Sequence, residues 1–153
     1  METTLSELQR LLALEDIRRL KARYFRFIDT KDWPGFTACF APDAVLDVSG
    51  EEERLLKNEA GVYRTATVIG EWGARCAIGI QTRHHILMPE IDVTSSSAAS
   101  ATWVIEDRFW WPEGAGPHRT LHGWGYEYET YVKLAGEWKI LTSRFKRVRT
   151  EYT

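Results

Sequence analysis

The segment AASATWVIEDRFWW, residues 98–111, decides the fold class. It is rich in β-branched and aromatic residues and alternates in polarity, which is typical of a strand with one buried face. Three segments of similar character, residues 80–93, 120–134 and 137–148, are separated from it and from each other by Ser-, Gly- or Pro-containing turns. The sequence therefore predicts four strands that follow one another after Gly79.

Helical periodicity precedes these strands. From Thr4 to Asp29, apolar residues recur every three to five positions, and Thr4 with Glu7 forms a candidate capping box. A short second helix is expected after the N-cap residue Asp32. The other expected elements are a strand at residues 44–48, an exposed excursion at 49–67 and a third helix at 68–78. Helices followed by a meander predict an α+β fold with the helices on one face of a curved, mainly antiparallel sheet.

Composition limits the class of protein. The 153 residues, 1–153, predict a single domain, and a net charge of −2 with both signs spread along the chain argues against nucleic-acid and membrane binding. Cys39 and Cys76 lie in apolar contexts without metal-ligand spacing, which predicts buried thiols and a cytoplasmic protein. The stock of 7 Trp, 6 Tyr and 6 Phe is large for one domain and indicates either an aromatic core or an aromatic pocket.

One carboxylate interrupts the apolar face of the segment that decides the fold. Trp103, Ile105 and Phe109 lie at every second position on one face of this strand, and Asp107 lies on the same face as these three. An ionised carboxylate buried without a partner costs several kcal/mol, roughly. Asp107 is therefore expected either to meet a partner or to line a cavity that uses a proton acceptor, with Trp103 and Phe109 as cavity wall.

Two adjacent histidines, His84 and His85, form the next candidate. Neighbouring residues on a strand point to opposite faces, so only one of the two can enter a given site, and the sequence leaves open which one. No further ligands stand at zinc-like spacing, which argues against a metal site. Tyr24 and Asp29 in the first helix are also candidates, although five helical residues place them about 140° apart.

The last two strands carry further side chains whose role the sequence leaves open. In residues 120–134, His122, Trp124 and Tyr126 alternate with Gly and Glu residues, which indicates cross-strand packing or a pocket wall. The last strand carries Arg144 and Arg147, which suit a solvated face, an oligomer contact or a site for an anionic part of a ligand.

Several short motifs occur together in a familiar order. They are Leu14-Glu15-Asp16-Ile17 leading to Tyr24 and Asp29, Phe40-Ala41-Pro42-Asp43-Ala44, Thr82-Arg83-His84-His85 with Met88-Pro89-Glu90-Ile91, Trp103 with Glu106-Asp107, His122-Gly123-Trp124-Gly125, and Gly136-Glu137-Trp138-Lys139-Ile140. Over most of its length the chain resembles the SnoaL-like group of the nuclear transport factor 2-like superfamily. The resemblance implies a cone-shaped α+β barrel, in which N-terminal helices pack in a strongly curved mixed, mainly antiparallel sheet.

Within that group the chain is most similar to scytalone dehydratase, bile-acid 7α-dehydratase and hexachlorocyclohexane dehydrochlorinase. The resemblance implies a helix-end Asp at Asp29 paired with a strand His at His84, Tyr24 as a donor to an oxygen that gains charge, and Asp107 assisting the leaving group or orienting a water. Arg147, or else Arg144, would approach an anionic part of the substrate.

The activity implied is that of a cofactor-independent lyase without metal, acting on an aromatic or polycyclic molecule. His84 would abstract a proton, and water, halide or a small fragment such as formaldehyde would be eliminated. The alternatives are an isomerase or cyclase with the same dyad, and a non-catalytic ligand-binding or oxygenase-accessory subunit. The residues expected to bind substrate are Trp103, Phe109, Ile86, Met88, Tyr126 and Arg147. A homo-oligomer, dimer or trimer, is expected through the outer sheet face near Trp110.

Overall fold

A single curved sheet organises the molecule. The computed structural model describes residues 5–51 and 59–153, and within them seven strands form one sheet in the order β2-β1-β7-β6-β5-β3, with β4 also paired to β5. Their bounds are β1 Phe40–Gly50, β2 Val62–Arg64, β3 Gln81–Ile86, β4 Glu90–Val93, β5 Ala98–Trp110, β6 Thr120–Leu134 and β7 Glu137–Tyr152. All pairs are antiparallel except β1 with β7. The mixed, mainly antiparallel sheet predicted from the sequence is confirmed.

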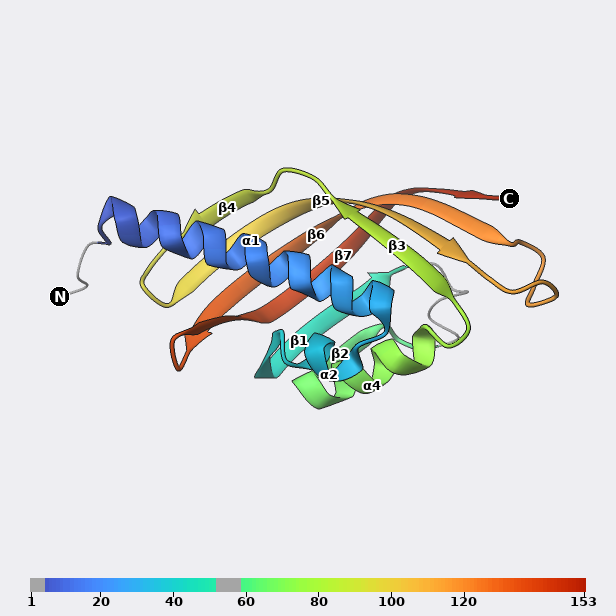
Figure 1. Ribbon diagram of the computed structural model, residues 1–153, viewed down its shortest axis with the longest axis horizontal. Coiled ribbons are helices and arrows are strands. Elements are labelled where there is room, and N and C mark those ends of the chain that lie inside the picture. Colours follow the sequence, from blue (N-terminus) through green and yellow to red (C-terminus); the bar gives the residue numbers. More distant parts are fainter. Residues whose placement is uncertain (1–4, 52–58) are drawn as a thin grey trace.

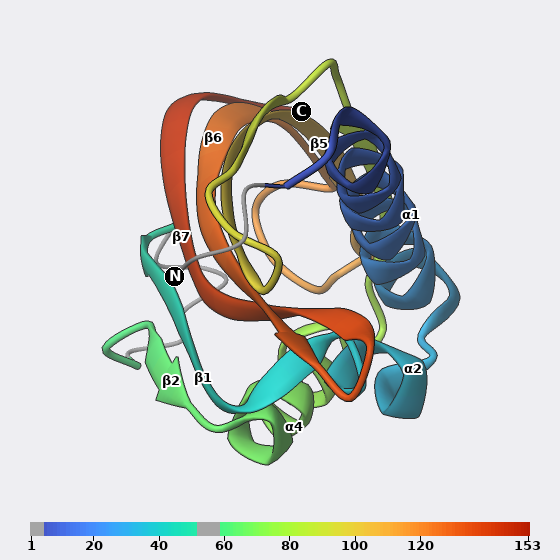
Figure 2. The same cartoon turned by 90° about the vertical axis from the view of Figure 1, so that its left-hand side faces the viewer.

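Three helices of the described chain lie on one side of this sheet. They are α1 (Glu7–Thr30), α2 (Trp33–Thr37) and α4 (Ala66–Cys76). Figure 1 shows α1 crossing β5, β6 and β7, with α2 and α4 next to each other below the C-terminal half of α1. In Figure 2 the strands curve around the space between α1 and α4, which is the cone expected from the sequence. None of the described helices is long and apolar enough to span a membrane.

The helix termini follow from local sequence. Ser6 accepts a hydrogen bond from the Gln9 backbone N–H, and the Gln9 side chain accepts one from the Ser6 N–H, so the capping box of α1 is two residues later than predicted. The predicted Thr4 cap lies outside the described residues. At its other end α1 stops at Lys31, whose φ of 61° is left-handed. Asp32 then caps α2 as predicted.

Three expected strand boundaries are wrong. The segment 80–93 is two strands, β3 and β4, because the chain leaves the ladder between Ile86 and Glu90, where Pro89 has no N–H to donate. The first strand begins at Phe40 rather than at residue 44, and the last continues to Tyr152. The expected excursion 49–67 contains β2 and the start of α4; its residues 52–58 lie outside the described part of the chain.

Candidate active site

A pocket opens between the concave face of the sheet and the helices. Its volume is about 120 Å³, and its walls are mainly apolar, with Phe25 from α1, Trp33 from α2, Trp72 from α4 and Phe109 from β5. The polar side chains that line it are Tyr24, Glu51, Thr82, His84, Asp107 and Glu127. Such a pocket suits an apolar ligand that carries a few polar groups.

His84 and Asp29 meet at this pocket. The Nδ1 atom of His84 lies 2.7 Å from Oδ1 of Asp29, and the backbone N–H of His84 donates to Oδ2 over 3.1 Å. The ring of His84 stacks on Phe25 at a centroid distance of 4.8 Å, and its side chain is 9% exposed. An ionised Asp29 requires the Nδ1–H tautomer, which leaves Nε2 with its lone pair for a ligand.

Asp29 is held by a chain of donors that the sequence did not indicate. Thr82 donates to Oδ1 of Asp29 over 2.9 Å, and Lys31 in turn donates to the Thr82 hydroxyl over 3.1 Å. Burial raises the pKa of Asp29, but the hydrogen bond and charge of His84 outweigh burial, so the pKa lies below its ordinary value of 3.8. Asp29 is therefore an ionised acceptor over the whole neutral range.

The question of the two histidines has a geometric answer. His84 lines the pocket, whereas His85 is exposed on the other face of β3. Asp29 reaches His84 from the last turn of α1, and Tyr24 also faces the pocket. Tyr24 and Asp29 both serve this pocket although they lie on different sides of α1, because Asp29 is hydrogen-bonded to β3 and Tyr24 is hydrogen-bonded to β6.

Asp107 meets a partner. Arg147 donates from Nη1 to Oδ1 over 2.7 Å and from Nη2 to Oδ2 over 3.0 Å, and it also binds both carboxylate oxygens of Glu51. Burial lowers the pKa of Arg147, but Asp107 and Glu51 together raise it above its ordinary value. Asp107 is thus the counter-ion of Arg147 and also lines the pocket, so it both meets a partner and faces a cavity. Its expected role toward a leaving group or a water stays a prediction. Arg144 is exposed, 3.7 Å from Asp47.

A second charged cluster lies between α1 and β6, and one of its members, Glu127, lines the pocket. Lys21, which is fully buried, lies 2.6 Å from Oε2 of Glu127 and 2.7 Å from Oε1 of Glu129. Tyr24 donates to Oε1 of Glu127 over 3.3 Å, and Ser143 donates to the same atom over 3.0 Å. Tyr24 thus has an anionic neighbour, which opposes a further negative charge on the oxygen it would contact.

Sequence reasoning missed this cluster, although a signal was available. Lys21 shares one helical face with the core residues Ile17, Leu20 and Tyr24, at the spacing i, i+3, i+4 and i+7. A lysine on a buried face requires buried carboxylates as partners.

Of the two alternatives for the aromatic side of β6, the described structure favours cross-strand packing over a pocket wall, because neither Tyr126 nor Tyr128 lines the pocket. Tyr126 and Tyr128 are 39% and 45% exposed on the outer face, while the alternating residues Gly123, Gly125, Glu127 and Glu129 are buried on the inner face.

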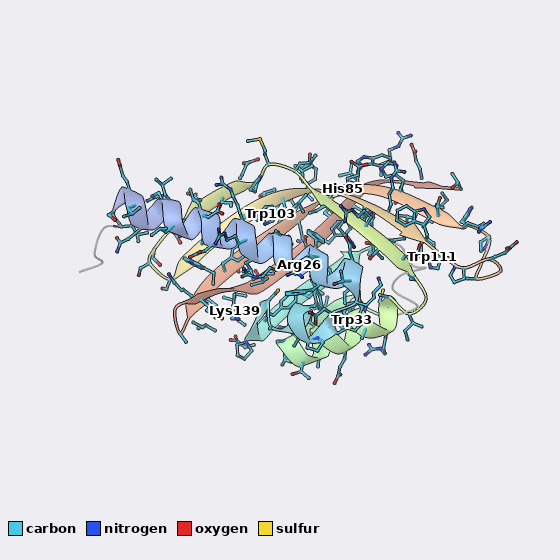
Figure 3. All side chains as sticks on the ribbon, viewed as in Figure 1. Arg26, Trp33, His85, Trp103, Trp111 and Lys139 are labelled. Carbon is cyan, nitrogen blue, oxygen red and sulfur yellow. The ribbon has the colours of Figure 1, made fainter. Side chains whose placement is uncertain are left out.

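The other expected substrate-binding residues divide into two groups. Phe109 lines the pocket, and Arg147 binds the two lining carboxylates Asp107 and Glu51. Trp103 does not line it: its ring lies beside α1 (Figure 3) and its Nε1 donates to Tyr131 over 2.8 Å, so it is core. Ile86, Met88 and Tyr126 are also absent from the lining, and Met88 is 91% exposed. In residues 5–51 and 59–153 no group of three or more His, Cys, Asp or Glu side chains could hold a metal ion.

Comparison with known proteins identifies the family. The family model of the SnoaL-like domain matches residues 9–144. The chain belongs to the SnoaL-like domain family. The fold is that of the nuclear transport factor 2-like superfamily, as the sequence motifs indicated.

Solved structures support the same fold. A provisionally named scytalone dehydratase from Novosphingobium aromaticivorans has a TM-score of 0.82 at 16% identity, over 97% of this chain and 92% of that one. A type 2 hexachlorocyclohexane dehydrochlorinase has a TM-score of 0.81 at 13% identity, over 97% and 93% of the two chains. A type 3 hexachlorocyclohexane dehydrochlorinase from Novosphingobium barchaimii has a TM-score of 0.80 at 14% identity, over 97% and 94%.

Proposed function

We propose that this SnoaL-like protein is a cofactor-independent lyase that removes a proton and a neighbouring leaving group from an aromatic or polycyclic small molecule. The observation that carries the proposal is the His84–Asp29 pair at the wall of an apolar pocket, with Nε2 of His84 left for the substrate. Structural relatives that are named as a dehydratase and as dehydrochlorinases agree with an elimination.

In the proposed reaction His84 is the general base. Its Nε2 takes a proton from a carbon made acidic by a neighbouring carbonyl group or phenol, and the C–H electron pair forms the new double bond as the leaving group departs. The imidazolium that forms is stabilised by Asp29 at 2.7 Å. Returning the same proton to a leaving hydroxyl releases water and restores His84. Positioned general-base catalysis of this kind contributes about 10²- to 10⁴-fold to the rate.

The remaining pocket residues orient the substrate in this proposal. Aromatic rings from α1, α2, α4 and β5 supply flat apolar walls. Tyr24 stays protonated, since burial and the charge of Glu127 raise its pKa well above 10, and its phenol can donate to a substrate oxygen. Because Oε1 of Glu127 lies 3.3 Å from the Tyr24 hydroxyl, the substrate oxygen that Tyr24 contacts is better suited to be a neutral hydroxyl group than an oxygen that gains negative charge.

The test is a screen of phenolic and enone compounds with the wild-type protein and with His84→Ala. Mass spectrometry distinguishes the reaction classes, because an elimination lowers the substrate mass by that of the leaving group, whereas an isomerase or cyclase leaves it unchanged. A product of lower mass that His84→Ala does not form supports the lyase. A His84-dependent product of unchanged mass, or saturable binding without any product, contradicts it.

A further inference from the structure

The Lys21 cluster gives the pocket a second polar pole. Glu127 lines the pocket, whereas Glu129 and Lys21 lie behind it. Glu127 and Glu129 share one cation here, and Glu127 is the carboxylate that faces the pocket. Lys21 stays charged, because Glu127 and Glu129 raise its pKa by more than burial lowers it.

This pole is distant from the catalytic dyad. His84 of β3 is paired with Asp107 of β5, and Asp107 is paired with Gly123 of β6. Glu127 stands four residues further along β6, which corresponds to about 13 Å at the rise of a β-strand. The ring of Phe25 contacts a ring at each pole, at 4.8 Å from the His84 ring and 4.8 Å from the Tyr24 ring. A flat ligand beside Phe25 can therefore reach both poles.

The hydrogen bonds of Glu127 leave a place for a ligand. Lys21 holds Oε2 at 2.6 Å and Ser143 holds Oε1 at 3.0 Å, while the bond from Tyr24 is the longest of the three at 3.3 Å. A hydroxyl group that enters from the pocket can accept from Tyr24 and donate to Glu127 at the same time. A carboxylate or phosphate in the same place would meet the charge of Glu127 and has no proton to donate.

We propose that Tyr24 and Glu127 form the recognition site for an uncharged hydroxyl group of the ligand, at the end of the pocket away from His84. The preferred ligand class is therefore hydroxylated and neutral at that end. This recognition site rests on the proposed function only where the ligand is called the substrate. Its test measures binding and does not require turnover.

The test compares three ligands of similar shape by calorimetry at pH 7. They are 2-naphthol, its methyl ether, which cannot donate a hydrogen bond, and 2-naphthoate, which is anionic. A hydrogen bond to a charged acceptor supports a preference of about tenfold or more for 2-naphthol over the ether, with 2-naphthoate binding weakest. Equal affinity of the wild type for 2-naphthol and the ether overturns the proposal without any variant.

Two matched variants assign the preference to Glu127. Glu127→Gln and Glu129→Gln each remove one negative charge and each leave Lys21 with one carboxylate within 2.7 Å, so both are expected to fold. Because Glu127 alone of the two lines the pocket, Glu127→Gln should reduce the preference for 2-naphthol below about threefold, and Glu129→Gln should retain it. An equal loss in both variants, or no loss in Glu127→Gln, contradicts the site.

His84→Ala separates this proposal from the proposed function. It should abolish turnover and keep the preference for 2-naphthol, since the hydroxyl lies at the other pole. If His84→Ala removes the preference and Glu127→Gln does not, the hydroxyl binds at the dyad and the proposed recognition site is wrong, while the lyase proposal stands.

Discussion

Arg147 on β7 and Asp107 on β5 bind each other through both carboxylate oxygens, across the strand β6 that lies between them. The pair passes directly over Gly123 of β6, where a Cβ atom would overlap both the guanidinium and the carboxylate. A glycine at this position is what allows the two charged groups to meet on the inner face of the sheet.

Gly123→Ala should therefore displace Arg147 from Asp107. Overpacking and the loss of a buried pair predict a decrease of about 2 to 4 kcal/mol in the free energy of unfolding, measured by urea denaturation. Arg149→Ala on β7, the strand that carries Arg147, is the control, since the ion pair of Arg149 with Glu151 is exposed and should contribute less than about 1 kcal/mol. A Gly123→Ala protein as stable as Arg149→Ala would show that the pair does not depend on this close approach.

Asp29→Asn should keep the fold and lower turnover about 10²- to 10⁴-fold, because an amide does not stabilise the His84 imidazolium. The wild-type carboxylate has a pKa below 3.8, so it stays ionised as pH falls to that value. The stability that Asp29 contributes is present above pH 3.8 and is lost as pH falls through its lowered pKa in the folded protein. The measurement is the difference in the free energy of unfolding between the wild type and Asp29→Asn as a function of pH. A decrease of this difference already near pH 6 would contradict the prediction.

Lys21→Met should destabilise the protein by about 3 to 5 kcal/mol at pH 7, because Glu127 and Glu129 lose their buried counter-ion. Burial already raises the pKa of Glu129, and without Lys21 it rises further. A raised pKa in the folded state means that protons are bound on folding, so Lys21→Met should gain thermal stability as pH falls from 8 to 5. A melting temperature that is highest at pH 8 in this variant would be inconsistent with ionised carboxylates in the cluster.

Cys39 predicts a loss of stability at alkaline pH. Burial raises the pKa of its thiol from 9.0 to about 11. Above pH 9 the unfolded thiol releases its proton while the folded thiol keeps it, so this contribution is complete below pH 9 and is lost as pH rises toward 11. Between pH 9 and 10 the melting temperature of Cys39→Ala should fall less than that of the wild type; parallel curves would exclude this origin.

Particular residues show how far the sequence could predict the structure. The alternation of Trp103, Ile105, Asp107 and Phe109 was sufficient for the strand and its inner face, because period-two burial is a local property. The choice of His84 over His85 depended on the resemblance, since neither face of β3 is apolar enough to decide it. The helical period around Lys21 indicates a buried lysine, but it does not indicate which carboxylates pair with it, because Glu127 is 106 residues away in the sequence.

The adjacent pair His84→Ala and His85→Ala tests the central claim most directly, because the two side chains are chemically identical and only His84 faces the pocket and Asp29. The measurement is kcat/KM with a substrate identified in the screen. The proposed mechanism predicts a decrease of about 100-fold or more for His84→Ala and less than about threefold for His85→Ala. Equal activity of the two variants, or the larger loss in His85→Ala, would contradict the assignment of His84 as the base.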